Sequence, residues 1–229
     1  MTSVKILVAG GTGLVGTELL KLLAQRSNVH VTALVRQIPA LGFSSDQLVF
    51  RVFDYDREED FQKLAQEKFD AVFCCLGTTR KKAGSDKDFA KVDFEYPQRL
   101  LATVAPSYPI FCAVSSVGAD KPRGLYLSTK AALEKTIMSS GLRYVILRPS
   151  LLLGQRQEFR LGEWIAGNLF SRLRPVLENF SEQKIAEFMP IYASEVARAM
   201  VTYALDRPPQ EGGLVIFGRA LFLTNSNYS

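Results

Sequence analysis

Residues Val4–Gly16 read VKILVAGGTGLVG, and this stretch decides the fold. The short apolar run Val4–Ala9 is typical of a buried parallel strand. A turn with glycines at Gly10, Gly13 and Gly16 follows it, and an amphipathic helix is expected next. A Gly-x-x-Gly-x-x-Gly turn between a strand and a helix is the pattern that dinucleotide binding requires.

Each glycine of this turn has its own expected role. Gly10 allows the tight turn, Gly13 lets the backbone approach a pyrophosphate, and Gly16 lets the helix pack closely on the strand. The free N–H groups of the first helical turn, beginning near Leu14 and Val15, then face the phosphates. Glycine also serves ordinary turns, but the strand and helix around these glycines favour a cofactor site.

Length and composition indicate a globular protein. The 229 residues suffice for one domain with a sizeable core, and we expect a single NAD(P)-binding domain over residues 1–229. Hydrophobic residues make up 47% of the chain and charged residues 22%. No apolar run approaches the roughly 20 residues of a membrane span, and glycines interrupt the N-terminal apolar stretch. We therefore expect neither a membrane span nor a signal peptide.

The three cysteines suggest a compartment. Cys74, Cys75 and Cys112 are odd in number and lie in apolar, strand-like runs, so they are expected to be buried thiols. Unpaired thiols are typical of a reducing environment, from which we expect a cytoplasmic protein.

The charge is moderately basic, with a net charge of +5 and a pI of about 9.1. Basic residues are spread along the chain, except for Arg80-Lys81-Lys82, which could form a cationic rim for an anionic substrate or a solvated loop. Neither an RNA-binding signature nor metal-ligand spacing is present, so we expect no nucleic-acid partner and no metal.

Strand-like and helix-like segments alternate along the chain, which predicts an α/β fold: one Rossmann-type, doubly wound parallel sheet. The nucleotide should then lie at the carboxyl ends of the strands. Residues 155–190 are the least regular region and are expected to form a small C-terminal substrate lobe. The expected strands are Val4–Ala9, Val29–Val35, Leu48–Phe53, Ala71–Leu76, Ile110–Val114, Tyr144–Leu147 and Leu214–Phe217; the later helices are Glu58–Lys68, Phe94–Val104, Leu125–Ser139 and Ser194–Leu205.

Arg36 indicates which nicotinamide cofactor is bound. In NAD binders an acidic residue about 20 positions after the glycines binds the ribose 2′-hydroxyl. Here Arg36 ends the second expected strand, and a guanidinium can pair with a 2′-phosphate, which favours NADP(H). Asp54 follows the third strand, where it can contact the adenine edge or simply close a turn.

Tyr126 and Lys130 form a Tyr-x-x-x-Lys pair on one face of an expected helix. A nearby ammonium stabilises a phenolate, which suits Tyr126 to general acid–base work. Ser115 and Ser116 end the fifth strand at the same sheet edge, where a hydroxyl can polarise a substrate carbonyl or cap a turn. Ser116 is our choice, with Ser115 the alternative.

These motifs, together with Arg148-Pro149, resemble those of the short-chain dehydrogenases/reductases of the atypical or extended type. More particular stretches are similar to the Tat-interacting-protein-like oxidoreductase branch. They are CLGTTRKKAG (Cys75–Gly84), KVD (Lys91–Asp93), SSVGADK (Ser115–Lys121) and LLLGQRQEFRLGEW (Leu151–Trp164).

The resemblance implies the following cofactor contacts. Thr12, Gly13, Leu14 and Val15 would line the pyrophosphate turn, and Arg36 would hold the adenosine phosphate. Leu76 and Gly77 would pass beside the cofactor, Leu153 would meet its nicotinamide end, and Arg160 would approach its phosphates. Tyr126 would donate a proton, with Lys130 as its partner and a ribose contact.

Two functions remain open at this point. The first is an NADPH-dependent reductase acting on a small carbonyl substrate, which the Tyr126–Lys130 pair favours. The second is a non-catalytic NADPH sensor that acts through a protein partner, which the short lobe and the unusual serine spacing favour. Isomerase or dehydratase work on a nucleotide sugar is a third, weaker option.

Overall fold

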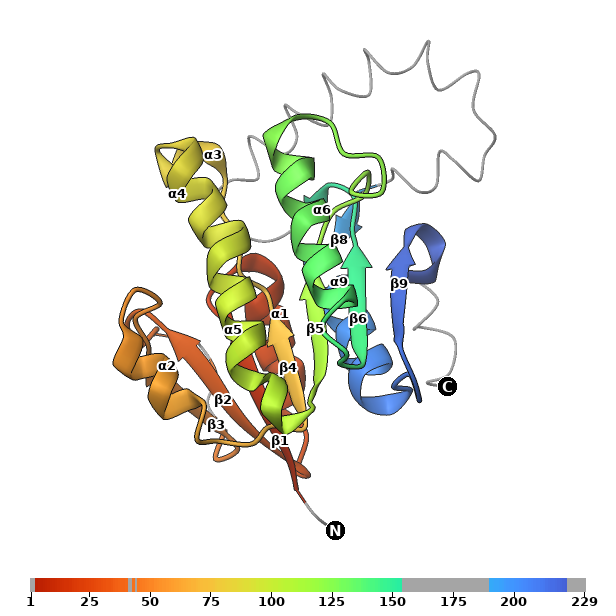
Figure 1. The fold of residues 1–229 in the computed structure, drawn as a ribbon. Coiled ribbons are helices and arrows are strands. Elements are labelled where there is room, and N and C mark those ends of the chain that lie inside the picture. Colours follow the sequence, from red (N-terminus) through yellow and green to blue (C-terminus); the bar gives the residue numbers. More distant parts are fainter. Residues whose placement is uncertain (1–2, 41–42, 44, 154–189, 222–229) are drawn as a thin grey trace.

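The computed structural model describes residues 3–40, 43, 45–153 and 190–221. In this part of the chain seven parallel strands form one sheet in the order β3-β2-β1-β4-β5-β6-β9 (Figure 1). The strands are β1 (Val4–Ala9), β2 (Val29–Val35), β3 (Leu48–Val52), β4 (Ala71–Cys74), β5 (Ile110–Val114), β6 (Tyr144–Arg148) and β9 (Gly213–Phe217). The predicted Rossmann-type sheet is confirmed, whereas the predicted lobe at residues 155–190 falls almost entirely outside the described residues.

Helices cover both faces of the sheet (Figure 1). Helices α1 (Leu14–Ala24) and α9 (Ala193–Val201) pack together on one face. The opposite face is covered by α2 (Glu58–Leu64), α5 (Tyr96–Val104) and α6 (Gly124–Met138). The remaining elements are α3 (Arg80–Ala83), α4 (Asp86–Ala90), η1 (Lys91–Glu95), η2 (Ala105–Ser107), η3 (Thr202–Asp206) and η4 (Gly218–Leu221), with a small second sheet of β7 (Leu152–Leu153) and β8 (Ile191–Tyr192).

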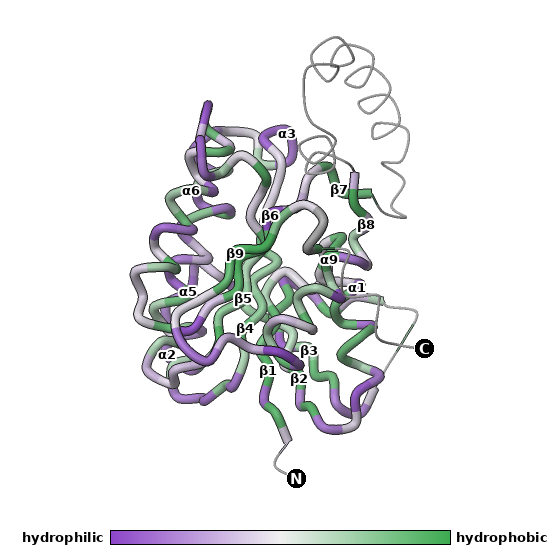
Figure 2. Tube along the Cα trace, turned by 90° about the vertical axis from the view of Figure 1, so that its right-hand side faces the viewer, coloured by the Kyte–Doolittle hydropathy of each residue, from purple (hydrophilic) through white to green (hydrophobic). Residues whose placement is uncertain are grey.

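The core explains why Val4–Ala9 lacks polar residues. Ile6 and Val8 face α1 and α9, while Leu7 and Ala9 face α2, α5 and α6. All four side chains are fully buried, because this central strand has a layer of helices on each side. Figure 2 shows the strands as a hydrophobic centre inside helices that also carry hydrophilic residues. Each large aliphatic side chain buried this way contributes about 1.5–3 kcal/mol.

The order of pairing creates a switch point at the carboxyl ends of β1 and β4, where a nucleotide is expected; we call this place the crevice. β1 pairs with β2 on one side, from Val4 opposite Val29, and with β4 on the other, from Ile6 opposite Ala71. The chain therefore leaves the carboxyl ends of β1 and β4 toward opposite faces of the sheet. Ligands of open α/β sheets bind at such a switch point.

One helix begins earlier than the sequence predicted. The segment expected to start at Phe94 is a continuous helical run that starts with α4 at Asp86, passes through the π-helical turn η1 and ends with α5. Ser85 caps its start, since the Ser85 hydroxyl accepts a hydrogen bond from the Asp88 amide at 3.0 Å. The wider π turn shifts the apolar side chains out of the 3.6-residue period. Hydrophobic periodicity therefore does not predict the part of this helical run that precedes Phe94.

Candidate functional site: a nucleotide crevice beside a Tyr–Lys–Asp cluster

The glycine turn after β1 is built so tightly that side chains do not fit. Gly10 has a φ of 79°, and a Cβ there would lie 2.5 Å from the carbonyl of Cys75. A Cβ on Gly16 would overlap the carbonyl oxygen of Gly10. Gly16 therefore brings α1 against the turn itself, a closer contact than the helix-to-strand packing that the sequence predicted.

The N-terminus of α1 keeps backbone donors at this crevice. Gly13 is its N-cap and offers no side-chain cap. The Gly13 amide donates to Gly10 at 3.0 Å, and the first intrahelical bond runs from the Thr17 amide to the Gly13 carbonyl at 2.9 Å. The amides of residues 14–16 precede that bond and have no partner within the helix, so they suit an anion such as a pyrophosphate.

Arg36 and Asp54 follow the carboxyl ends of the neighbouring strands. Arg36 comes directly after β2 and is exposed, and its guanidinium makes no ion pair with any residue that the structure describes. Asp54 accepts a hydrogen bond from the Asp56 amide at 2.9 Å, while its own amide donates to Asp60 at 2.9 Å. Asp54 thus closes the turn that begins α2, which is the structural alternative left open by the sequence, and its contact with a cofactor stays a prediction.

The α6 helix places Tyr126 and Lys130 at the other side of the crevice. Tyr126 lies in its first turn and is 42% exposed, whereas Lys130 is only 4% exposed. The Lys130 ammonium lies 5.9 Å from the centre of the Tyr126 ring. A Cβ on Gly77 would lie 3.7 Å from the same ammonium. The structure therefore brings Gly77 beside the Tyr126–Lys130 pair of α6.

Asp93 completes this cluster and was not among the predicted site residues. Its Oδ1 lies 2.8 Å from the Lys130 ammonium, and its Oδ2 accepts a hydrogen bond from the Thr78 amide at 2.7 Å. Asp93 is 1% exposed and sits on the π turn η1, a type of turn that occurs frequently at functional sites. The sequence signal was the KVD stretch, but nothing in its spacing indicated a contact with Lys130, which lies 37 positions further along.

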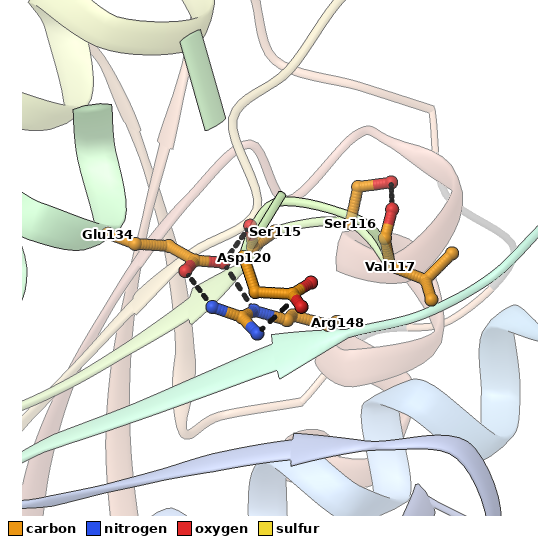
Figure 3. Close-up of polar contacts among 6 residues, drawn as sticks. All are labelled: Ser115, Ser116, Val117, Asp120, Glu134 and Arg148. Atoms are coloured by element: carbon orange, nitrogen blue, oxygen red, sulfur yellow. Dashed lines mark hydrogen bonds and ion pairs between the residues drawn. The ribbon is translucent and has the colours of Figure 1, made fainter. Parts of the chain in front are cut away.

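The two serines after β5 have different surroundings (Figure 3). Ser115 is buried, and its hydroxyl donates to Glu134 of α6 at 2.5 Å. Ser116 is half-buried, points away from Glu134, and among the described residues makes only a long 3.3 Å contact, with the Val117 carbonyl. Of the pair, Ser116 thus keeps the hydroxyl that is less committed to a protein partner.

The remaining predicted residues are spread around the crevice. Leu76 is the second residue after the end of β4, and Leu153 ends β7, opposite Tyr192. Arg80-Lys81-Lys82 form the exposed helix α3, where Arg80 pairs with Asp86. Arg160 lies outside the described residues.

The cysteines do not offer a nucleophile at this site. All three are free thiols, and burial raises the pKa of the Cys74 thiol to about 11. Burial also raises the pKa of Cys75 and Cys112. Thiols with such raised pKa values carry little thiolate at neutral pH.

Comparison with known proteins identifies the family. A family model described as NAD(P)H-binding matches residues 10–189. The chain belongs to this NAD(P)H-binding family. It is 34% identical to the protein HTATIP2 of Rattus norvegicus over 76% of this chain and 73% of that one. It is 29% identical to the mitochondrial protein FMP52 of Candida albicans over 86% of each chain. Within the family it is of the atypical short-chain dehydrogenase/reductase type, in the HTATIP2-like branch.

Solved structures agree on the fold. An ADP-L-glycero-D-manno-heptose-6-epimerase from Helicobacter pylori has a TM-score of 0.68 at 17% identity, covering 94% of this chain and 77% of its own. MoeE5, solved in complex with UDP-glucose and NAD, has a TM-score of 0.68 at 19% identity, covering 96% and 80%. The chain is therefore an NAD(P)H-binding protein with a Rossmann-like fold and the resemblance drawn from its motifs is confirmed.

The comparisons correct the expectation of a cytoplasmic protein. Yeast relatives, including those of Candida albicans and Debaryomyces hansenii, are named mitochondrial. Unpaired cysteines indicate only a reducing environment, which does not distinguish the cytoplasm from the interior of an organelle. Among the described residues, no helix has the length and apolar character needed to cross a membrane. The same part of the chain gathers no cluster of three or more His, Cys, Asp or Glu side chains suited to a metal.

Proposed function

We propose that the protein is an NADPH-dependent oxidoreductase that reduces a small carbonyl compound. The observation that carries this proposal is the position of the Lys130 ammonium. It lies beside the Tyr126 ring and close to Gly77, where the chain leaves β4 at the nucleotide crevice. The residue that we propose as proton donor, its cationic neighbour and the backbone that we propose as a cofactor contact thus lie close together.

The crevice has the properties that a dinucleotide needs. The space around Gly10 and Gly16 admits no side chain, and the amides at the start of α1 would hold the pyrophosphate. Arg36 would pair with the 2′-phosphate, which favours NADPH over NADH. Leu76, Gly77 and Leu153 would line the path toward the nicotinamide. When bound, the reduced cofactor supplies the hydride.

The side chains on and beside α6 would then transfer the proton to the substrate. Tyr126 would donate its hydroxyl proton to the substrate oxygen as negative charge develops there. Lys130, held by Asp93 at 2.8 Å, would stabilise the phenolate that remains and bind a ribose hydroxyl. Ser116 would donate a hydrogen bond to the carbonyl oxygen and orient it toward Tyr126.

A non-catalytic NADPH sensor is the second candidate, and one observation favours it. The charge of Lys130 is already paired with the buried Asp93 carboxylate. An ammonium whose charge is offset in this way stabilises a Tyr126 phenolate less, which weakens the acid without weakening cofactor binding.

Calorimetric titration with NADPH and with NADH tests cofactor binding and preference. The same samples are then mixed with small aldehydes and ketones while the nicotinamide absorbance band is followed. Preferential NADPH binding with carbonyl-dependent loss of absorbance is expected of the reductase. Tight binding without turnover for any compound would contradict it and support the sensor.

A further inference from the structure

A buried polar cluster joins α6 to the ends of β5 and β6 (Figure 3). At its centre, the Glu134 carboxylate accepts a hydrogen bond from the Ser115 hydroxyl at 2.5 Å. Arg148 donates two more to it, from Nε at 2.9 Å and from Nη2 at 2.5 Å. The Glu134 side chain is 5% exposed and that of Arg148 14%. We call these three residues, Ser115, Glu134 and Arg148, the α6 clamp.

The clamp lies on the helix face that carries the proposed chemistry. Glu134 comes four residues after Lys130 and eight after Tyr126, so the three side chains follow one another along one face of α6. Ser115 is the direct neighbour of Ser116 in the chain. Glu134 thus connects the helix that presents Tyr126 with the turn that presents Ser116.

Packing alone would not require charged side chains at the positions of the clamp. Burying a carboxylate and a guanidinium costs several kcal/mol each, and apolar side chains of similar volume are often as stable. The paired Arg–carboxylate geometry fixes direction as well as distance, since both N–H groups must meet both oxygens. The bonds to Glu134 also raise the pKa of the Arg148 guanidinium further above its usual range.

The clamp also separates the roles of the two serines. The Ser115 hydroxyl has one proton, and that proton points to Glu134. Ser115 therefore has none left to donate to a substrate oxygen, whereas Ser116, in the part of the chain that the structure describes, has only its long contact with the Val117 carbonyl.

We propose that Glu134 is a positioning residue: through Ser115 and Arg148 it fixes the turn that carries Ser116 against the α6 face that carries Tyr126. This inference rests on the proposed reductase, in which Ser116 and Tyr126 must meet the same oxygen. A displacement of about 1 Å between groups that act together can cost on the order of 100-fold in rate.

Two variants test the clamp. Ser115→Ala removes one bond and leaves the charge pair intact. Glu134→Gln combined with Arg148→Met removes both buried charges together, so that the one carboxylate left without its partner is Asp120, which lies 3.7 Å from Arg148 and is 52% exposed to solvent. The matched control is Glu67→Gln, because Glu67 and Arg51 form the same two-bond pair at 2.5 and 3.0 Å, but with side chains that are 39% and 37% exposed.

Steady-state kinetics with NADPH and a carbonyl compound that the wild type reduces gives the main readout. We expect kcat to fall about 10-fold for Ser115→Ala and roughly 10- to 100-fold for the double variant. The KM for the carbonyl compound and the NADPH Kd should stay within about threefold, since the binding crevice is untouched. Glu67→Gln should match the wild type. A kcat within about twofold of wild type for both clamp variants would overturn the inference.

Backbone amide exchange over residues 115–123 separates this inference from the proposed function. If the wild type reduces nothing, the reductase proposal fails, and the clamp is judged by exchange alone. Well below the Tm of each variant, exchange in this turn should be at least about tenfold faster in the double variant and unchanged in Glu67→Gln. Equal exchange rates in the double variant and the wild type would overturn the clamp.

Discussion

The two sides of the crevice are built by different means. Around the glycine turn after β1, the backbone would form the site: Gly10 and Gly16 leave no room for a side chain, and the α1 amides would be the donors. Around α6, buried charges form the site: Asp93 holds Lys130, and Glu134 holds Ser115 and Arg148. An added side-chain atom disrupts the close packing of the glycine turn, whereas the loss of one charged group leaves its partner near α6 buried and unpaired. The two sides should therefore fail in different ways.

The largest effect is expected from Asp93→Asn on the charged side. The amide keeps the shape and can still accept the bond from the Thr78 amide, but Lys130 becomes a buried ammonium with no counter-charge. Removing one partner of a buried pair costs about 3–5 kcal/mol of unfolding free energy. Urea denaturation measures this loss.

The control for this prediction restores neutrality. Asp93→Asn combined with Lys130→Met should be more stable than Asp93→Asn alone, because no unpaired charge remains. Equal stabilities of the single and the double variant would show that the ion pair does not contribute as described.

The next effect is expected from Gly16→Ala on the backbone side. The new Cβ overlaps the Gly10 carbonyl oxygen and moves α1 away from the turn. Loss of two charge-assisted hydrogen bonds to phosphate, at about 1.5–3 kcal/mol each, lowers NADPH affinity by at least about 100-fold. Fluorescence titration with NADPH measures it. Thr17→Ala, one residue along the same helix, removes a 3.3 Å bond to Gly11 and should bind NADPH within about threefold of wild type.

A smaller and more selective effect is expected from Arg36→Ala. Without the guanidinium, the 2′-phosphate loses a charge-assisted partner worth about 1.5–3 kcal/mol, or roughly 10- to 150-fold in NADPH affinity. NADH lacks that phosphate, so its affinity should not change. Paired calorimetric titrations measure the ratio, and an unchanged preference would remove Arg36 from the site.

The smallest effect is expected from an ion pair on the surface that involves η1, the turn that carries Asp93. Lys91 of η1 pairs with Asp56, which precedes α2, at 2.8 Å, and the hydrogen bond from Lys91 holds the pKa of Asp56 below its usual value. Because the folded-state pKa is lowered, this contribution is present above the ordinary aspartate pKa of about 3.9 and is lost as the pH falls through the folded value. Asp56→Asn should lower Tm by less than about 4 °C at neutral pH. It should leave Tm unchanged at a pH below the folded-state pKa of Asp56, where the carboxylate is protonated. Thermal unfolding at several pH values measures it; a Tm loss that persists in acid would contradict the ion pair as its cause.

The sequence predicted the backbone side better than the charged side. Glycine spacing, a strand before it and a helix after it are local signals, and they placed Gly10, Gly13 and Gly16 correctly in the strand–turn–helix unit. Parallel pairing also follows from the alternation of segments, because short connections restrict the possible topologies.

The charged side depends on contacts between distant residues. Asp93 contacts Lys130, and Glu134 contacts Ser115 and Arg148, because β4, β5 and β6 lie side by side in the folded sheet. No period or spacing in a single sequence encodes such a contact. The π turn under Asp93 adds to the difficulty, because it breaks the helical period that would have placed this carboxylate on a face. The choice between Ser115 and Ser116 likewise needed the position of Glu134.

The rate of NADPH oxidation by Tyr126→Phe tests the central claim most directly. The phenylalanine keeps the ring beside Phe89 and Lys130 and removes only the hydroxyl group, with the proton that it would donate. With a carbonyl compound that the wild type reduces, we expect the kcat of Tyr126→Phe to fall by at least about 100-fold, while its NADPH Kd stays within about threefold of wild type. A variant that oxidises NADPH as fast as the wild type would contradict Tyr126 as the proton donor and, with it, the functional division between the two sides of the crevice.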